Sequence, residues 1–206
     1  MNTPHVYALL LCAFVVPMSP ACALLSKGQP GAPRFFSLDR AVERSDGLRT
    51  RVPETQGEPV ELRLGRITGA NHLEERLVFR DSAYEVRYYR ELRWTEPPEV
   101  CLERLLARAL FERRKLRHVV GGSGPTLDVH LTVFDEILVP QHVVRMQVVV
   151  RLHNRQLVLW EETLNFERPM IEEKGADPAL AAVEALADAM AVAVDGIADR
   201  VVSELQ

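Results

Sequence analysis

Three consecutive segments in the second half of the chain alternate apolar and polar residues, and this alternation limits the fold more than any other feature. The segments cover residues 127–133, 144–152 and 158–166. A period of two predicts strands with one buried and one solvated face. The connections around residues 140–141 and 153–155 are short, so these strands should form an antiparallel meander. The residues of the first segment that we expect on the buried face are Leu127, Val129, Leu131 and Val133.

Two helices are predicted around this meander. Thr95-Glu96-Pro97-Pro98 ends one strand and begins a helix to about Leu116, because proline cannot join a ladder but suits the first helical turn. Asp177-Pro178 is an N-cap followed by a first-turn proline, and it predicts a long helix over Ala179 to Leu205. The apolar stripe of the second helix is Val183, Leu186, Met190, Val194, Ile197, Val201 and Leu205. It indicates a core-facing surface or a protein interface.

Earlier in the chain, alternation predicts strands over residues 60–67, 76–80 and 84–94. In the last of these, Arg90 interrupts an apolar parity that runs from Tyr84 to Trp94, and it indicates a bulge or a sheet edge. Residues 34–38 are either a short edge strand or a docking segment. The predicted fold is α+β: a single domain with a mixed, largely antiparallel sheet of about five to six strands and two main helices packed on it. With 206 residues, 47% of them hydrophobic, the chain can form such a core.

The charge of the chain argues against nucleic-acid binding. The formal net charge is −4, whereas phosphate binding requires a concentrated basic face. The basic residues from Arg113 to His118 lie at the end of the first predicted helix, where positive charge complements the helix dipole. No aromatic platform accompanies them, so we predict no nucleic-acid partner.

The N-terminus has the pattern of a signal peptide. The apolar run Val6 to Val16 is too short to span a hydrocarbon core of about 30 Å. Small residues, Ser19 and Ala21, follow it, as signal peptidase requires, although the first five residues contain no Lys or Arg. We therefore predict a signal peptide of the lipoprotein type over residues 1–21.

Ser19-Pro20-Ala21-Cys22 resembles a bacterial lipobox, with Ser19 in place of the usual Leu. The predicted cleavage falls between Ala21 and Cys22, and Cys22 would carry diacylglycerol and an amino-linked chain such as palmitate. The alternative is an ordinary secretory signal cut near Ala21 or Ala23. Ala23 after the cysteine indicates the outer membrane by the sorting habit of enterobacteria. Residues 22–57 would then be a lipidated tether and residues 58–206 the folded domain.

Candidate catalytic groups are scattered. His72, His118, His130, His142 and His153 show no metal-ligand spacing. The pairs Asp135-Glu136 and Glu161-Glu162 are interpreted as solvated strand ends, and Cys101 as a buried hydrophobe. Gly121-Gly122-Ser123-Gly124-Pro125 has neither the second glycine of a nucleophile elbow nor the Lys of a phosphate loop, so it is a turn. We predict no catalytic residue, no metal and no cofactor.

The order of these parts resembles the ABC-type transport auxiliary lipoprotein family, which includes paraquat-inducible lipoproteins of the PqiC type. The resemblance rests on the lipobox cysteine, on Tyr84-Glu85-Val86-Arg87-Tyr88-Tyr89, and on Arg93-Trp94-Thr95-Glu96-Pro97-Pro98 before a leucine-rich helix. The motif residues that it singles out are Tyr88, Tyr89, Arg93, Trp94, Glu96, Pro97 and Pro98.

This resemblance implies a non-catalytic lipoprotein, anchored to the outer membrane and facing the periplasm, in an intermembrane lipid transport system. Its implied partners are a mammalian cell entry (MCE) domain protein, an ABC permease and an ATPase, and it would form a homo-oligomer. Residues 58–206 would be the ABC transport auxiliary lipoprotein domain. The competing interpretations are a structural lipoprotein of another envelope assembly, such as a secretion or peptidoglycan-synthase accessory, and a small periplasmic hydrolase.

Overall fold

A computed structural model of the chain describes residues 31–38, 60–122, 124–170 and 175–206. The residues from Ala32 to Gln206 form one unit. Its elements in chain order are β1 (Arg34–Phe36), β2 (Glu61–Gly69), β3 (Arg76–Arg80), β4 (Arg87–Trp94), α2 (Pro98–Ala107), the π-helical turn η1 (Arg108–Arg113), β5 (Arg117–His118), β6 (Thr126–Ile137), β7 (Val143–His153), β8 (Val158–Pro169) and α3 (Pro178–Leu205).

The predicted meander is confirmed: β7 pairs antiparallel with both β6 and β8 along nearly its whole length. The other edge of β6 is shared by two strands that both run parallel to it. β2 pairs with the first half of β6, and β3 pairs with the last three residues. Antiparallel pairing with β4 and then parallel pairing with β1 extend the sheet beyond β3, and β5 pairs with β2.

The predicted α+β fold is therefore confirmed. The six longer strands are those that the alternation predicted, and β1 is the edge strand that was left open for residues 34–38. Only the two-residue β5 has no counterpart in the sequence prediction. The register between β3 and β4 shifts along the stretch of β4 that holds Arg90, as the broken parity indicated. Tyr84 was wrongly assigned to this strand: it precedes β4 and is 98% exposed.

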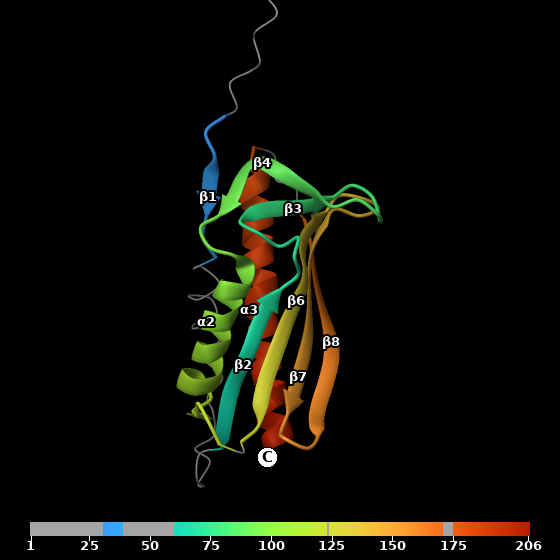
Figure 1. The fold of residues 1–206 in the computed structure, drawn as a ribbon. Helices are drawn as coiled ribbons and strands as arrows, with labels where there is room; N and C mark the ends of the chain where they lie inside the picture. The colour runs from blue at the N-terminus through green and yellow to red at the C-terminus, as the bar shows by residue number, and fades with distance from the viewer. Residues whose placement is uncertain (1–30, 39–59, 123, 171–174) are drawn as a thin grey trace, which may run out of the picture. The chain divides into compact units, whose positions relative to one another are not determined.

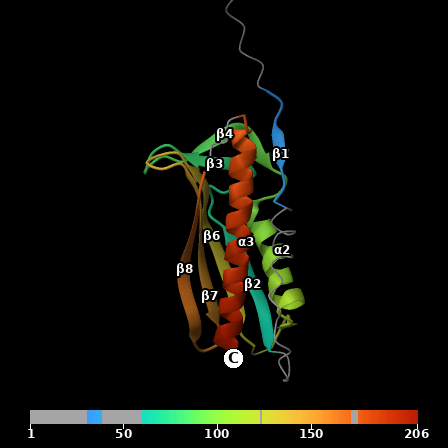
Figure 2. The same cartoon turned by 180° about the vertical axis from the view of Figure 1, so that it is seen from behind.

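Both helices lie on one face of the sheet (Figures 1 and 2). α2 lies beside β2, and α3 crosses β7 and β8. The N-cap prediction is confirmed, because the Asp177 carboxylate accepts a hydrogen bond from the backbone N–H of Ala179 at 3.1 Å. The apolar stripe of α3 is buried from Val183 to Val201, so it faces the core.

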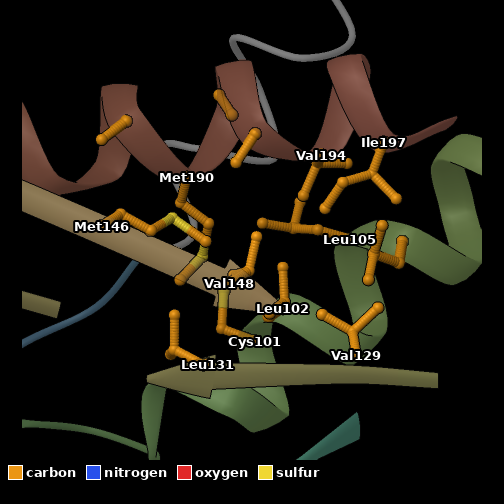
Figure 3. Close-up of a cluster of buried hydrophobic side chains, with 14 of the residues drawn as sticks. Cys101, Leu102, Leu105, Val129, Leu131, Met146, Val148, Met190, Val194 and Ile197 are labelled. Carbon is orange, nitrogen blue, oxygen red and sulfur yellow. The ribbon is translucent and has the colours of Figure 1, made fainter. Parts of the chain in front are cut away.

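The core lies between the helices and the sheet (Figure 3). Met190, Val194 and Ile197 of α3 face Met146 and Val148 of β7. Leu102 and Leu105 of α2 close the cluster from the side, and Cys101 beside them is fully buried, as its apolar surroundings predicted.

One buried-face prediction is wrong, because β6 contains a bulge. The register between β6 and β7 shifts between Leu131 and Val133, so the following residues change faces. Phe134, 1% exposed, takes the core position expected for Val133, which is only half-buried. The same shift turns Glu136 toward the helix side and Asp135 toward the outer side of the sheet.

Candidate functional site

The sequence motif from Tyr88 to Pro98 occupies the end of β4 and the turn into α2. Ala21 and Cys22, the predicted cleavage and lipid-attachment residues, lie outside the described residues. The motif residues have different structural roles, and the contacts of each residue show which role it has.

Tyr88 and Tyr89 point to opposite faces of β4. The guanidinium of Arg76 lies 4.1 Å from the centre of the Tyr88 ring. Tyr89 packs its ring 4.6 Å from Phe79 and donates a hydrogen bond of 2.7 Å to Glu136. Burial, and the hydrogen bond to the Glu136 carboxylate, raise the pKa of Tyr89, so its hydroxyl stays a donor at all physiological pH.

Trp94, Pro97 and Pro98 build the junction between strand and helix. Trp94 is 2% exposed, and its ring centre lies 5.7 Å from that of Phe134. Pro97 is the N-cap residue of α2 and Pro98 its first helical residue. Because proline has no N–H to leave unsatisfied and a fixed φ, this pair starts the helix where the strand stops. Glu96 then forms an ion pair of 2.6 Å with Arg104 in the helix.

Arg93 is the charged motif residue that lines a cleft, and Pro97 also lines it. Arg93 contributes to this cleft of about 430 Å³ together with Arg76 on the neighbouring strand. The β2–β3 connection forms another side of the cleft, and the start of α2 completes it. The remaining lining residues are Leu73, Glu74, Glu75, Pro97 and Glu99.

Glu99 enters this cleft from the first turn of α2. A Cβ on Gly69 would lie 2.8 Å from its Oε2, so the absence of a side chain at Gly69 makes room for the carboxylate. Oε2 is buried and has no hydrogen-bond partner among the described residues. The cleft therefore presents two guanidinium groups and three carboxylates, which suits a polar or charged partner surface rather than an apolar ligand.

The sequence motif identified Arg93 and Pro97 but not the other walls of the cleft. Glu74 and Glu75 precede β3, and the antiparallel pairing of β3 with β4 brings them beside Arg93. Gly69 ends β2 and lies against Glu99 of α2. No local pattern in the sequence encodes this arrangement. The motif alone could therefore indicate a site but not its shape.

The five histidines of the domain lie at separate positions. Their polar or ring contacts include His72 with Asp135 at 3.9 Å, His118 with Phe111 at 4.1 Å, His130 with Thr68 at 2.8 Å, His142 with Glu136 at 2.6 Å and His153 with Asp128 at 3.0 Å. In the described ranges, no group of three or more His, Cys, Asp or Glu side chains is placed to hold a metal ion.

The interpretation of Asp135-Glu136 as a solvated strand end is wrong. Asp135 is fully buried and Glu136 is 5% exposed. The Asp135 carboxylate pairs with Arg80, and the Glu136 carboxylate is bound by Tyr89 and His142. Asp135 and Glu136 are consecutive in β6 and so lie on opposite faces of the sheet, and they do not form one acid/base pair. Glu161, in contrast, is exposed and pairs with Arg151 at 2.8 Å.

The basic residues at the end of the first helical segment bind α3. Arg113 and Arg114 contact Asp195 at 2.9 and 3.4 Å, and Arg114 also contacts Asp199 at 2.8 Å. Arg114 is only 8% exposed, so it joins the end of the first helical segment to α3 rather than facing a phosphate backbone. Within the part of the chain that the structure describes, no helix is both long and apolar enough to cross a membrane.

Solved structures share the fold, among them these two. Protein XCC0632 from Xanthomonas campestris, described as a DUF330 protein, aligns with a TM-score of 0.61 and 17% identity over 80% of this chain and 92% of its own. An uncharacterized protein aligns with a TM-score of 0.61 and 15% identity over 82% of this chain and 99% of its own. No protein with curated annotation matches.

The family is identified by a sequence comparison. A sequence model described as the ABC-type transport auxiliary lipoprotein component matches residues 47–202, which include the cleft, α2 and most of α3. The match confirms the resemblance drawn from the Tyr-Tyr, Arg-Trp and Glu-Pro-Pro motif. This chain belongs to the ABC-type transport auxiliary lipoprotein component family.

Proposed function

We propose that the protein is a non-catalytic, lipid-anchored component of an ABC/MCE-type lipid transport system and docks the MCE protein at the outer membrane. The observation that carries this proposal is the family match over residues 47–202. A family of auxiliary transport lipoproteins implies a transporter partner and association with a membrane of the cell envelope. The MCE protein, its permease and ATPase, and a homo-oligomeric state are the finer parts of the proposal.

The anchor is Cys22, with cleavage after Ala21 and an acylated mature N-terminus. Each buried CH₂ of a lipid chain contributes about 0.8 kcal/mol to membrane binding, so two or three chains would hold the protein stably. β1 limits the reach of this anchor, because pairing with β4 makes Arg34 part of the sheet. Residues 23–33 then separate the lipid from the folded unit by at most roughly 40 Å of extended chain.

The proposed docking surface is the cleft around Arg93. It unites motif residues with the β2–β3 connection, and its mixture of guanidinium and carboxylate groups is typical of the polar part of a transient interface. Arg93 forms no ion pair within the described residues, so its charge is available to a partner.

The anchor is tested by mass spectrometry of the mature N-terminus and by fractionation of a Cys22→Ser variant. We expect a triacylated residue 22 in the unaltered protein and release of the variant into the soluble periplasm. An unmodified terminus at residue 22 or 24 would instead support the ordinary secretory signal.

Docking is tested by co-purification with an MCE-domain protein of the same organism. We expect Arg93→Glu to reduce recovery of the MCE protein about tenfold, since charge reversal at a desolvated contact costs more than about 1 kcal/mol. Arg155→Glu, in the β7–β8 turn and away from the cleft, is the matched control. Equal recovery with both variants would show that the docking surface lies outside the cleft. Co-purification with secretion or peptidoglycan-synthesis proteins alone would favour a role as a structural lipoprotein of one of those assemblies.

A further inference from the structure

β8 is a long strand whose second edge pairs with no described strand. All of its described pairs are with β7, and their register is continuous from Trp160 to Pro169. An open edge offers a row of backbone N–H and C=O groups to another strand. Sheet edges are usually protected against pairing with another chain by Lys, Pro or a bulge in mid-strand. Residues 163–166 of β8 are instead Thr-Leu-Asn-Phe with a regular register.

The side chains of β8 on the helix side are incompletely covered. Leu164 and Phe166 pack against the core but stay half-buried. Glu162 and Arg168, on the same face, flank this apolar pair. Glu162 accepts a hydrogen bond of 3.0 Å from the Trp160 indole, and Arg168 donates to the Glu167 carbonyl, but neither has an oppositely charged partner among the described residues.

We propose that β8 pairs antiparallel with β8 of a second copy of this chain, with Asn165 on the two-fold axis. In this register Glu162 lies opposite Arg168 of the other copy, and Leu164 lies opposite Phe166. Both pairs occur twice, because a two-fold interface repeats every contact. Opposite charges and apolar residues facing each other across strands stabilise such pairing.

Neighbouring registers are less favourable. Moving the axis to Leu164 would place Glu161 opposite Glu167 and Glu162 opposite Phe166. Moving it to Phe166 would place Leu164 opposite Arg168. An axis between two residues would pair helix-side residues with outer-face residues and so turn the second sheet over. Only the register centred on Asn165 matches both charge and polarity along the strand.

This pairing specifies the interface of the homo-oligomer in the proposed function, and it rests on the homo-oligomeric part of that proposal. The anchor and the docking of the MCE protein do not depend on it. A failure of the pairing would therefore appear in cross-linking and sedimentation, and a failure of the transport role would appear in fractionation and co-purification.

The register is tested by cysteine capture in the full mature chain. We expect Asn165→Cys to form a disulfide-linked dimer under mild copper-phenanthroline oxidation, because its two copies would face each other. Thr163→Cys and Glu167→Cys should each give little dimer alone and a cross-linked dimer when mixed. Equal cross-linking by all three single variants, or none by Asn165→Cys, would overturn the proposal.

The charge pairing is tested by sedimentation equilibrium. We expect Arg168→Glu to weaken dimerisation about tenfold, since it places Glu opposite Glu162. Adding Glu162→Arg should restore most of the affinity, whereas adding Glu161→Arg should not. Circular dichroism of each variant shows that the fold is retained. A protein that is monomeric at roughly 100-fold the concentration used for capture, or a double variant no tighter than the single one, would overturn the proposal.

Discussion

At the scale of single residues, the Tyr89 hydroxyl is one of two groups that satisfy a buried carboxylate, Glu136. Tyr89→Phe would remove this donor and leave Oε2 of Glu136 without it. A buried acceptor that loses its donor costs about 1–3 kcal/mol, so we expect a loss of that size in the free energy of unfolding. Urea denaturation monitored by circular dichroism measures it.

Tyr88→Phe is the matched control for this prediction. The Arg76 guanidinium stacks on the Tyr88 ring, and phenylalanine keeps that contact. We expect a change below about 0.5 kcal/mol. Equal losses from the two variants would show that the hydrogen bond to Glu136 contributes nothing specific.

Asp177 carries a pH-dependent contribution at the start of α3. The hydrogen bond from Arg34, together with that from the Ala179 N–H, lowers the pKa of the Asp177 carboxyl below its ordinary value despite some desolvation. Because the folded-state pKa is the lower one, the stability from this group is complete above the unfolded-state pKa. It is lost as the pH falls through the folded-state pKa.

We therefore expect Arg34→Gln to raise the pKa of Asp177 and to reduce the loss of stability on acidification. NMR titration of the Asp177 carboxyl carbon measures the shift. Arg151→Gln is the control, because it should raise the pKa of Glu161, its own partner, and leave Asp177 unchanged. An Asp177 pKa that is unchanged in Arg34→Gln would contradict the role of Arg34 in lowering it.

Residue identity alone could not place Asp135 and Glu136. The alternation of Leu127, Val129, Leu131 and Val133 continues through the bulge without interruption, so the pattern contains no sign of the shift. The bulge is fixed by tertiary structure: β2 leaves the edge of β6 near Leu131 and β3 joins it at Asp135. Local periodicity therefore could not predict the burial of these two acids.

At the scale of elements, the contact between β2 and β6 depends on Gly65. Its missing side chain leaves room for Asp128, whose Oδ1 accepts a hydrogen bond of 2.7 Å from the Arg66 N–H. A Cβ on Gly65 would lie 2.1 Å from that Oδ1 and 3.1 Å from the Leu127 carbonyl oxygen. The pairing register shifts at the same place, between Leu64 and Ile67.

Gly65→Ala should therefore destabilise the fold by about 1–3 kcal/mol, the usual range for overpacking. Gly196→Ala is the opposite case, because nothing lies within 4 Å of its added Cβ and it sits within α3. Alanine is a better helix former than glycine, so we expect a gain of about 0.5–1 kcal/mol. Denaturant midpoints of both variants measure these changes, and a shift of the two in the same direction would contradict this role of Gly65.

The helices were the elements most predictable from sequence. Asp177-Pro178 and Pro97-Pro98 carry local start signals, and both helices begin there. The first helical segment changes into the π-helical turn η1 before it ends, and helix propensities do not predict this change. At its end, Arg113 and Arg114 form ion pairs with Asp195 and Asp199 of α3, a segment distant in sequence.

At the scale of the whole folded unit, residues 34–38 contribute more than a connection to the proposed anchor. β1 pairs with β4, the Thr95 N–H donates to the Phe36 carbonyl at 2.9 Å, and Arg34 binds Asp177. Leu38 follows β1 and is 2% exposed within the hydrophobic core. These contacts join the N-terminal segment to a strand, a turn and a helix start that are distant from it in sequence.

Leu38→Ala should therefore lower the free energy of unfolding by about 2–5 kcal/mol, as expected for a truncated core leucine. Phe35→Ala is the matched control from the same segment, because Phe35 is 60% exposed and should cost less than about 1 kcal/mol. Urea titrations of both variants in the mature chain compare them directly. If Leu38→Ala were as mild as Phe35→Ala, residues 34–38 would be only part of a tether. A large loss would instead mean that the distance between the proposed lipid anchor and the domain is set by residues 23–33 alone, because β1 and Leu38 are held by the fold.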